Sequence, residues 1–213
     1  MNFELREVKF VDGDELAAVQ AASLADNDLD KALHPGQTAH EAEADYKKRW
    51  LSVYGYGPWH YRAVVEVATG KIIAFSRWTV SDDHSTIIPQ REDLPEGATV
   101  PPREKPTCLD TDFAKEYNAR SVQVLEKCTQ GRKNMFLDVM GTLPEYRQHR
   151  PATLMLQWAR TFAATHGLVC YAETSEADAS MCRDAGLEPV DKFEVQASEK
   201  LITLYTFKHE VTS

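Results

Sequence analysis

The clearest indication of the fold comes from residues Phe136–Asp191, FLDVMGTLPEYRQHRPATLMLQWARTFAATHGLVCYAETSEADASMCRDAGLEPVD. This stretch begins inside a mostly apolar segment, residues 134–143, which is typical of a strand buried on both faces of a sheet. Residues 151–166 then show apolar side chains at helical spacing, with a proline in the first turn and a glycine after the end. A second apolar strand, 168–174, and a short helix, 175–186, follow. This alternation of strands and helices indicates an α/β layer architecture.

The same signals predict the remaining elements. β-Branched and aromatic residues predict strands, and apolar residues three and four positions apart predict helices. We expect strands at 3–10, 189–196 and 201–208, a hairpin at 60–80, and helices near 13–25, 40–53 and 110–129. The polar stretch 26–38, DNDLDKALHPGQT, is expected to be a turn-forming loop.

A single domain is expected to cover residues 1–213, because this length suits one sizeable core and the sequence contains no internal repeat. A surface insertion is expected near 81–109. Residues 81–106 hold five of the ten prolines, many charges and little periodicity, which favours an irregular excursion over a regular element.

Charge and hydropathy exclude several function classes. Lys and Arg number 24 and Asp and Glu 33, giving a net charge of −9 that opposes non-specific binding to nucleic acid. No apolar run approaches the ~20 residues of a membrane span, and residues 1–10 read as a strand rather than a signal peptide, so we expect a cytoplasmic protein that uses no membrane. The four cysteines and seven histidines show no metal-ligand spacing, so we expect free thiols and no metal.

Two motifs within residues 136–191 resemble those of a known family. Met140–Tyr146, MGTLPEY, resembles the apolar-x-Val-x-Pro-x-Tyr pattern of the GCN5-related N-acetyltransferases (GNAT), especially the fungal-type members, and Met181–Leu187 falls on that family's Leu-Tyr-x-x-x-Gly-Phe. Arg147–Ala152 falls on its Gln/Arg-x-x-Gly-x-Gly/Ala loop in a degenerate form. Upstream, residues 29–36, LDKALHPG, resemble the loop that borders the acceptor substrate. The resemblance covers most of 1–208 and implies a GNAT-like mixed central sheet of about seven strands flanked by helices.

The resemblance also implies acetyl-CoA as the cofactor. Unpaired N–H groups and the dipole at a helix N-terminus favour a pyrophosphate there, and a splay between strands 134–143 and 168–174 gives the pantetheine backbone partners. The implied coenzyme-binding residues are Met140, Gly141, Thr142, Arg147, Gln148, His149, Arg150, Ala152, Thr153 and Ser175. Arg150 stands at a glycine of the family pattern, and Pro151 has no N–H to donate. The basic cluster of Arg147, His149 and Arg150 suits phosphate, and the alternative is a solvated turn that starts a helix.

Three residues are candidates for the chemistry. Asp138 lies in the middle of an apolar strand, where a buried carboxylate costs free energy unless it is paired or protonated. It is therefore a candidate general base or amine anchor. The alternative is a structural hydrogen bond to a neighbouring helix or loop. Glu173 is a second candidate carboxylate, although its position favours a solvent-exposed strand end. Cys182 replaces the tyrosine that protonates the leaving thiolate in the family, but a small half-buried helix residue is the plainer interpretation. By resemblance, His34 borders the substrate.

The leading hypothesis is an acetyl-CoA-dependent N-acetyltransferase acting on a small amine or metabolite. The first alternative is a GNAT-fold enzyme that no longer uses acetyl-CoA and catalyses another reaction on a small metabolite. The second is a module that only binds such a metabolite. The acceptor loops carry no general code for the substrate, and the sequence does not indicate an oligomeric state.

Overall fold

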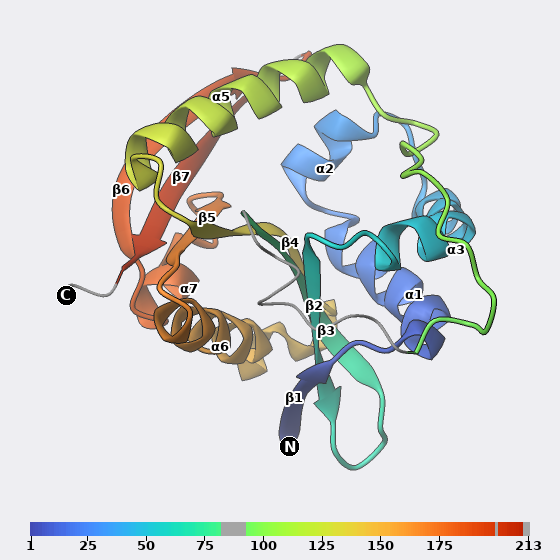
Figure 1. Ribbon diagram of the computed structural model, residues 1–213. Coiled ribbons are helices and arrows are strands. Elements are labelled where there is room, and N and C mark those ends of the chain that lie inside the picture. The colour runs from blue at the N-terminus through green and yellow to red at the C-terminus, as the bar shows by residue number, and fades with distance from the viewer. Residues whose placement is uncertain (82–92, 199, 211–213) are drawn as a thin grey trace.

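One seven-stranded sheet forms the centre of the molecule (Figure 1), in a computed structural model that describes residues 1–81, 93–198 and 200–210. The sheet order is β1-β2-β3-β4-β5-β7-β6. Among the strands that the structure describes, only β4 and β5 pair in parallel, so the sheet is mixed, and the predicted fold class is confirmed. The strands are β1 (Phe3–Glu7), β2 (Trp59–Glu66), β3 (Ile72–Val80), β4 (Asn134–Thr142), β5 (Val169–Thr174), β6 (Glu188–Gln196) and β7 (Leu201–His209).

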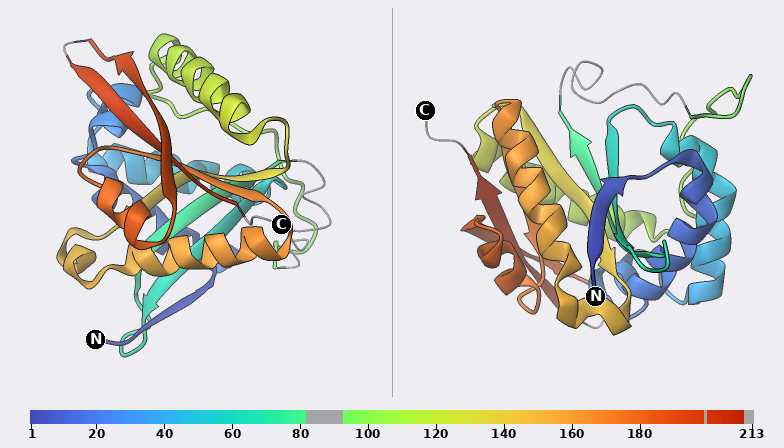
Figure 2. Two further views of the ribbon diagram at one scale, coloured as in Figure 1. Left: turned by 90° about the vertical axis from the view of Figure 1, so that its left-hand side faces the viewer. Right: turned by 90° about the horizontal axis from the view of Figure 1, so that it is seen from below.

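Helices cover both faces of the sheet (Figure 2). The helix between the two parallel strands, α6, packs on one face together with α7, while α1 packs against α3 and lies on β3 and β4. The long helix α5 packs on β6 and also contacts α2. The helices are α1 (Gly13–Leu24), α2 (Asp28–Leu33), α3 (Ala39–Tyr54), α5 (Thr111–Thr129), α6 (Pro151–Thr165) and α7 (Ala179–Asp184), with short 3-10 turns η1 (Phe10–Asp12) and η2 (Pro144–His149).

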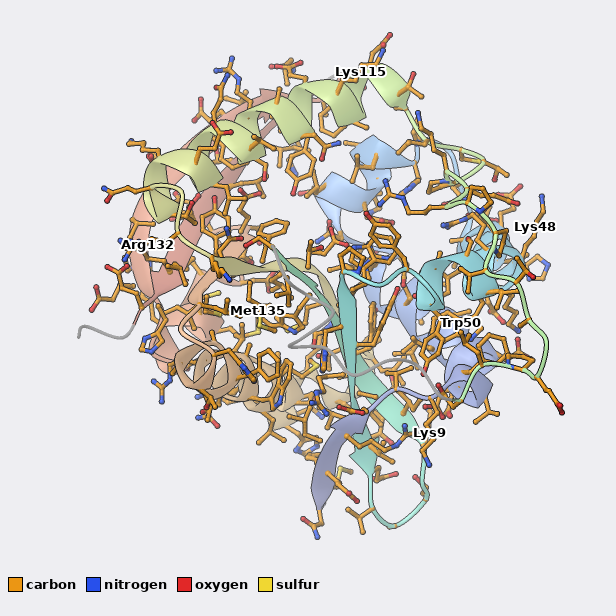
Figure 3. All side chains as sticks on the ribbon, viewed as in Figure 1. Lys9, Lys48, Trp50, Lys115, Arg132 and Met135 are labelled. Carbon is orange, nitrogen blue, oxygen red and sulfur yellow. The ribbon has the colours of Figure 1, made fainter. Side chains whose placement is uncertain are left out.

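The core consists of apolar clusters on the two faces of the sheet, because side chains alternate along each strand. On the α6 face, Met135 and Leu137 of β4 pack with Leu156 of α6. On the α1 and α3 face, Trp50 packs with Phe75 and other buried aromatic residues. Figure 3 labels one member of each cluster, Met135 and Trp50. Asp138 follows Leu137 and therefore faces away from the α6 cluster.

The predicted elements are present, but the first strand ends at Glu7 rather than at residue 10 and the short helix 175–186 is confined to Ala179–Asp184. The larger difference is at residues 26–38. The predicted loop is wrong there, because Asp28–Leu33 forms helix α2. The Asn27 side chain caps it by accepting a hydrogen bond from the Asp30 N–H at 2.9 Å. Leu29 and Leu33 pack against the cluster that contains Phe113 and Phe193. Burial of this short apolar side therefore outweighs the polar composition of the segment.

The predicted insertion near 81–109 falls partly on residues 82–92, which lie outside the described part of the chain. Its remaining part is tied to the α3 side of the molecule. Asp93 accepts hydrogen bonds from the Tyr54 hydroxyl at 2.7 Å and the Phe10 N–H at 2.5 Å. Further along, Thr107 N–H donates to Asp45 at 3.2 Å. Across the described residues, none of the helices combines the length and hydropathy needed to cross a membrane.

Candidate active site

The parallel strands β4 and β5 diverge halfway along β4. They pair from Asn134 with Val169 to Leu137 with Ala172, and beyond this point β4 continues to Thr142 alongside β3 while β5 continues alongside β7. The β5-facing backbone of the last five residues of β4 therefore borders an opening, which is the splay that the resemblance implies. A backbone that lacks a strand partner needs hydrogen-bond partners of another kind, and a ligand with amide groups can supply them.

A cleft of about 1120 Å³ runs through this opening. One half lies along the end of β4, the start of α6 and α7, and the other half lies between α1, α2, α3, α5 and β7. Aromatic side chains line the second half, including Trp59, Tyr46, Tyr117 and Phe136. Such a concave site with apolar walls and a few polar groups is typical of a small-molecule site.

Asp138 lies at the point where the strands diverge and forms an ion pair with Arg77 of β3. The Arg77 Nε is 2.6 Å from Asp138 Oδ2, and the two side chains are 16% and 27% exposed. The Arg77 guanidinium also stacks on Trp59, with Cζ 3.8 Å from the ring centroid. Burial lowers the pKa of Arg77, and Asp138, Tyr61 and Tyr46 raise it by more, so the net pKa lies above its usual value. Arg77 therefore stays charged and holds Asp138 in place.

Glu173 occupies the equivalent position on β5, one residue beyond the last β4–β5 pair. It is half-buried, and three hydroxyl groups donate to it: Ser121 and Tyr171 to Oε1, each at 2.8 Å, and Tyr117 to Oε2 at 3.2 Å. Burial raises the pKa of Glu173, and the hydrogen bonds from Tyr171, Ser121 and Tyr117 oppose part of this rise. The predicted solvent-exposed strand end is therefore wrong, because α5 packs over this end of the sheet and covers the carboxyl group.

Residues 147–153 run from the end of η2 through Arg150 into the first turn of α6. They are the segment that the resemblance implies for coenzyme binding, and we call them the coenzyme loop. Arg150 has φ 55° and ψ 42°, the left-handed conformation that favours glycine, which explains why the family pattern has glycine at this position. Its guanidinium pairs with Asp184 at 3.0 Å. The Arg147 guanidinium donates to Thr142 O at 3.3 Å and to Ser23 O at 3.1 Å, so it ties the loop to β4 and α1.

The first turn of α6 offers few free N–H donors. Pro151 has none, and the Thr153 N–H already donates to Arg150 O at 3.1 Å. The basic side chains of the coenzyme loop partly offset this loss, since Arg147 and Arg150 line the cleft. The site thus keeps the splay and the positive charge expected of a coenzyme A site, with fewer backbone contacts for phosphate.

The structure brings most of the predicted site residues together. The predicted residues that line the cleft are Asp138, Glu173, His34, Met140, Gly141, Thr142, Arg147, Arg150, Ala152, Thr153 and Ser175. Gln148, His149 and Cys182 do not line it. The His149 ring packs on Phe3 with centroids 6.0 Å apart, and the Gln148 amide donates to Glu145 O at 2.8 Å. Within the cleft, the His34 ring is 3.3 Å from Asp30, and the Ser175 hydroxyl is 3.1 Å from Asp178.

Cys182 lies in the α6-face core and is 0% exposed. Burial raises the pKa of its thiol to about 12. A fully buried thiol that faces the core has no route to a ligand in the cleft. The structure therefore favours the packing role for Cys182 over the role of an acid.

Four residues of the site were not predicted: Arg77, Tyr117, Ser121 and Tyr171. Some of them had a signal in the sequence. Tyr117 and Ser121 are four residues apart on a predicted helix and so share a face, and Tyr171 and Glu173 are two residues apart on a predicted strand. Tyr117 and Ser121 reach Glu173 only because α5 packs over β5. No local sequence pattern specifies this packing.

Comparison with solved structures places the fold among the N-acetyltransferases. A mosquito arylalkylamine N-acetyltransferase-like protein matches with a TM-score of 0.65 and 14% sequence identity, over 99% of this chain and 100% of that chain. The Drosophila melanogaster polyamine N-acetyltransferase, which forms N-acetylagmatine, matches with a TM-score of 0.62 and 12% identity over the same shares. At this identity the likeness shows the fold alone, and the chain has the GNAT fold.

A third similar structure is a condensation domain. It is the C-terminal condensation domain of Ebony, in complex with β-alanyl-dopamine, with a TM-score of 0.64 and 13% identity over 99% of this chain and 100% of that chain. No protein-family profile and no curated protein sequence matches this chain.

Proposed function

We propose that this chain, which has the GNAT fold, is an acetyl-CoA-dependent N-acetyltransferase acting on a small amine or metabolite. The observation that carries the proposal is the pair of carboxylates, Asp138 and Glu173, at the point where β4 and β5 diverge inside the cleft. Each carboxylate directly follows a residue of the last β4–β5 pair, Leu137 and Ala172, which pack in the α6-face cluster. Because side chains alternate along a strand, both carboxylates lie on the opposite side of the sheet, which faces α1 and α5.

Glu173 is the general base. An amine must lose its proton before it can attack an acyl group, and a base works best when its pKa lies near the working pH. Burial raises the pKa of Glu173 in that direction. In the described part of the chain no basic side chain pairs with Glu173, so its carboxylate is available to accept a proton.

Asp138 anchors and orients the amine. Its ion pair with Arg77 at 2.6 Å fixes the position of the carboxylate beside the cleft, where it attracts a positively charged amine. Trp59, which stacks on Arg77, forms an aromatic wall beside this carboxylate. The division of roles follows from the partners, because one carboxylate is held by a cation and the other by neutral hydroxyl groups.

The residues present fit coenzyme A with a reduced set of phosphate contacts. The backbone of Met140–Thr142 at the open edge of β4 would hold the pantetheine, and Arg147, Arg150, Ala152 and Thr153 would face the phosphates, with Ser175 across the cleft. Acetyl-CoA, when bound, supplies an acetyl group activated as a thioester. The chain's own residues bind and orient the amine and take its proton.

A second candidate is an enzyme of the same fold that uses no acetyl-CoA and acts on a small metabolite. Two observations favour it: the first turn of α6 lacks the N–H of Pro151 and uses that of Thr153 internally, and a condensation domain is among the similar structures. This candidate keeps the roles of Asp138 and Glu173 and changes only the group that is transferred.

The test is an acetylation assay with acetyl-CoA and a panel of aromatic and aliphatic amines. The expected result is turnover of at least one amine by the wild type and a loss of about 10²- to 10⁴-fold in kcat for Glu173→Gln, the range that general base catalysis supplies. Glu176→Gln is the matched control, because Glu176 is exposed and lies three residues further along the chain, outside the cleft. Equal loss in both variants, or wild-type rates for Glu173→Gln, would remove Glu173 from the mechanism.

A further inference from the structure

Three hydroxyl groups surround the Glu173 carboxyl, and they are not equivalent. Ser121 and Tyr171 both donate to Oε1, and each of these residues is buried. Tyr117 alone donates to Oε2, at 3.2 Å, and it also lines the cleft. Ser121 lines the cleft as well, but its hydroxyl serves the other oxygen. The Tyr117 hydroxyl therefore lies between Oε2 of Glu173 and the cleft.

The Tyr117 hydroxyl keeps its proton. Burial raises its pKa well above the usual value, and the charges of Glu173 and Asp138 raise it further. The hydroxyl therefore donates to Glu173 through its only hydrogen, which leaves its oxygen lone pairs free to accept a hydrogen bond from a group in the cleft. A protonated amine is such a donor, and both carboxylates attract it.

We propose that Tyr117 is a further catalytic residue, a proton relay that contacts the amine and passes its proton to Glu173. In this step an N–H bond of the ammonium breaks and its proton bonds to Tyr117 Oη, while the Tyr117 O–H bond breaks and that proton bonds to Glu173 Oε2. The amine is left neutral with a free electron pair, Tyr117 is again a phenol, and Glu173 is a neutral carboxylic acid. The inference rests on the proposed function, because it assigns the route to the base of that reaction.

The groups facing Glu173 come from four elements. They are Tyr117, Ser121 and Cys128 of α5, Asp138 of β4, Tyr171 of β5, and Thr206 of β7, which pairs with Glu173 across the sheet. Asp138 is the one charged side chain in this set, and Arg77 balances it. Loss of a hydroxyl donor from the set disfavours the ionised form of Glu173, so the pH at which Glu173 ionises moves upward.

The experiment compares Tyr117→Phe with Ser121→Ala. Phenylalanine keeps the ring that stacks on Phe193 at 6.3 Å, so the fold of α5 is retained. Each variant removes one hydroxyl from Glu173, but only Tyr117→Phe removes the relay. The pH dependence of kcat/KM is measured with an amine that the wild type acetylates, and the carboxyl band of protonated Glu173, identified as the band absent from Glu173→Gln, is followed by infrared titration without substrate.

The expected result is that the infrared band persists to higher pH in both variants, while the high-pH plateau of kcat/KM falls about 100-fold in Tyr117→Phe and less than tenfold in Ser121→Ala. Equal plateaus with equal infrared shifts would show that Tyr117 only positions Glu173, and the relay would be wrong while the proposed function stood. If the wild type acetylated no amine at any pH, the proposed function and the relay would fall together.

Discussion

A substitution at Gly141 tests how closely α1 packs on β4 at the wall of the cleft. A Cβ at this position would lie 2.1 Å from Ser23 Oγ, 2.7 Å from Phe75 Cε1 and 2.8 Å from Ser23 Cβ. All three distances are far below van der Waals contact. The glycine therefore lets α1 approach β4 closely, and this approach also places Ser23 O within 3.1 Å of Arg147. We predict that Gly141→Ala destabilises the protein and disturbs the coenzyme loop.

The magnitude follows from the contacts. Adding a methyl group to a well-packed site costs about 1–3 kcal/mol. For a chain of this length each kcal/mol lowers Tm by about 2–4 °C, so Tm should fall by roughly 2–12 °C. Ser23→Gly removes both α1 atoms that the new methyl group meets, at a cost of about 0.5–1 kcal/mol for a glycine within a helix. In Gly141→Ala with Ser23→Gly, the destabilisation should therefore be smaller than the sum of the two single effects.

The assay is denaturant unfolding of the wild type, both single variants and the double variant, which closes a double-mutant cycle. We expect a favourable coupling of about 1 kcal/mol or more, because the two residues are in direct contact. Additive effects, or a Gly141→Ala variant as stable as the wild type, would show that α1 does not pack on β4 this closely.

Four further predictions concern the site. Asp138→Asn should lower kcat by more than it raises KM, because an amine that is bound without its orienting carboxylate reacts slowly; steady-state kinetics that show only a higher KM would contradict this. Cys182→Ala should keep most activity and cost about 1 kcal/mol of unfolding free energy, whereas a hundredfold loss of kcat would make the thiol catalytic. The acid limb of kcat/KM should lie above pH ~4.3, the ordinary glutamate pKa, because burial raises the pKa of Glu173, whose ionised form is the active base; a limb at or below that pH would refute this. Arg150→Gly with Pro151→Ile should tighten acetyl-CoA binding about tenfold or more in calorimetry, since a charged hydrogen bond contributes about 1.5–3 kcal/mol; unchanged or weaker binding would show that these departures do not limit the site.

The fold was largely predictable because its signals are local. The apolar runs of β4 and β5 and the striped helix α6 between them follow from residue spacing alone, and the structure places all three within a residue or two of the predicted bounds. Helix α2 was missed because its stability comes from contacts of Leu29 and Leu33 with distant residues, Phe113 and Phe193 among them. A six-residue helix is too short for its own propensity to predict it.

The site was predictable only in part. Arg147 and Arg150 were expected from their positions in the loop motif, and Asp138 from its place in an apolar strand. All three belong to one continuous segment of the sequence, and all three line the cleft. The environment of Glu173 depends on α5, whose Tyr117 lies 56 positions away in the sequence, and so the sequence favoured exposure where the structure has burial. Likewise, the Arg77 partner of Asp138 becomes its neighbour only through the pairing of β3 with β4.

The proposed function requires that acetyl-CoA binds in the opening between β4 and β5. The most direct measurement is a calorimetric titration of the wild-type protein with acetyl-CoA, with the Arg150→Gly, Pro151→Ile double variant titrated in parallel. We expect weak saturable binding by the wild type and tighter binding by the variant, because both keep the splay and the variant regains one backbone N–H donor, at position 151. No heat of binding from either protein at millimolar acetyl-CoA would rule out this site and leave the enzyme that uses no acetyl-CoA as the better conclusion.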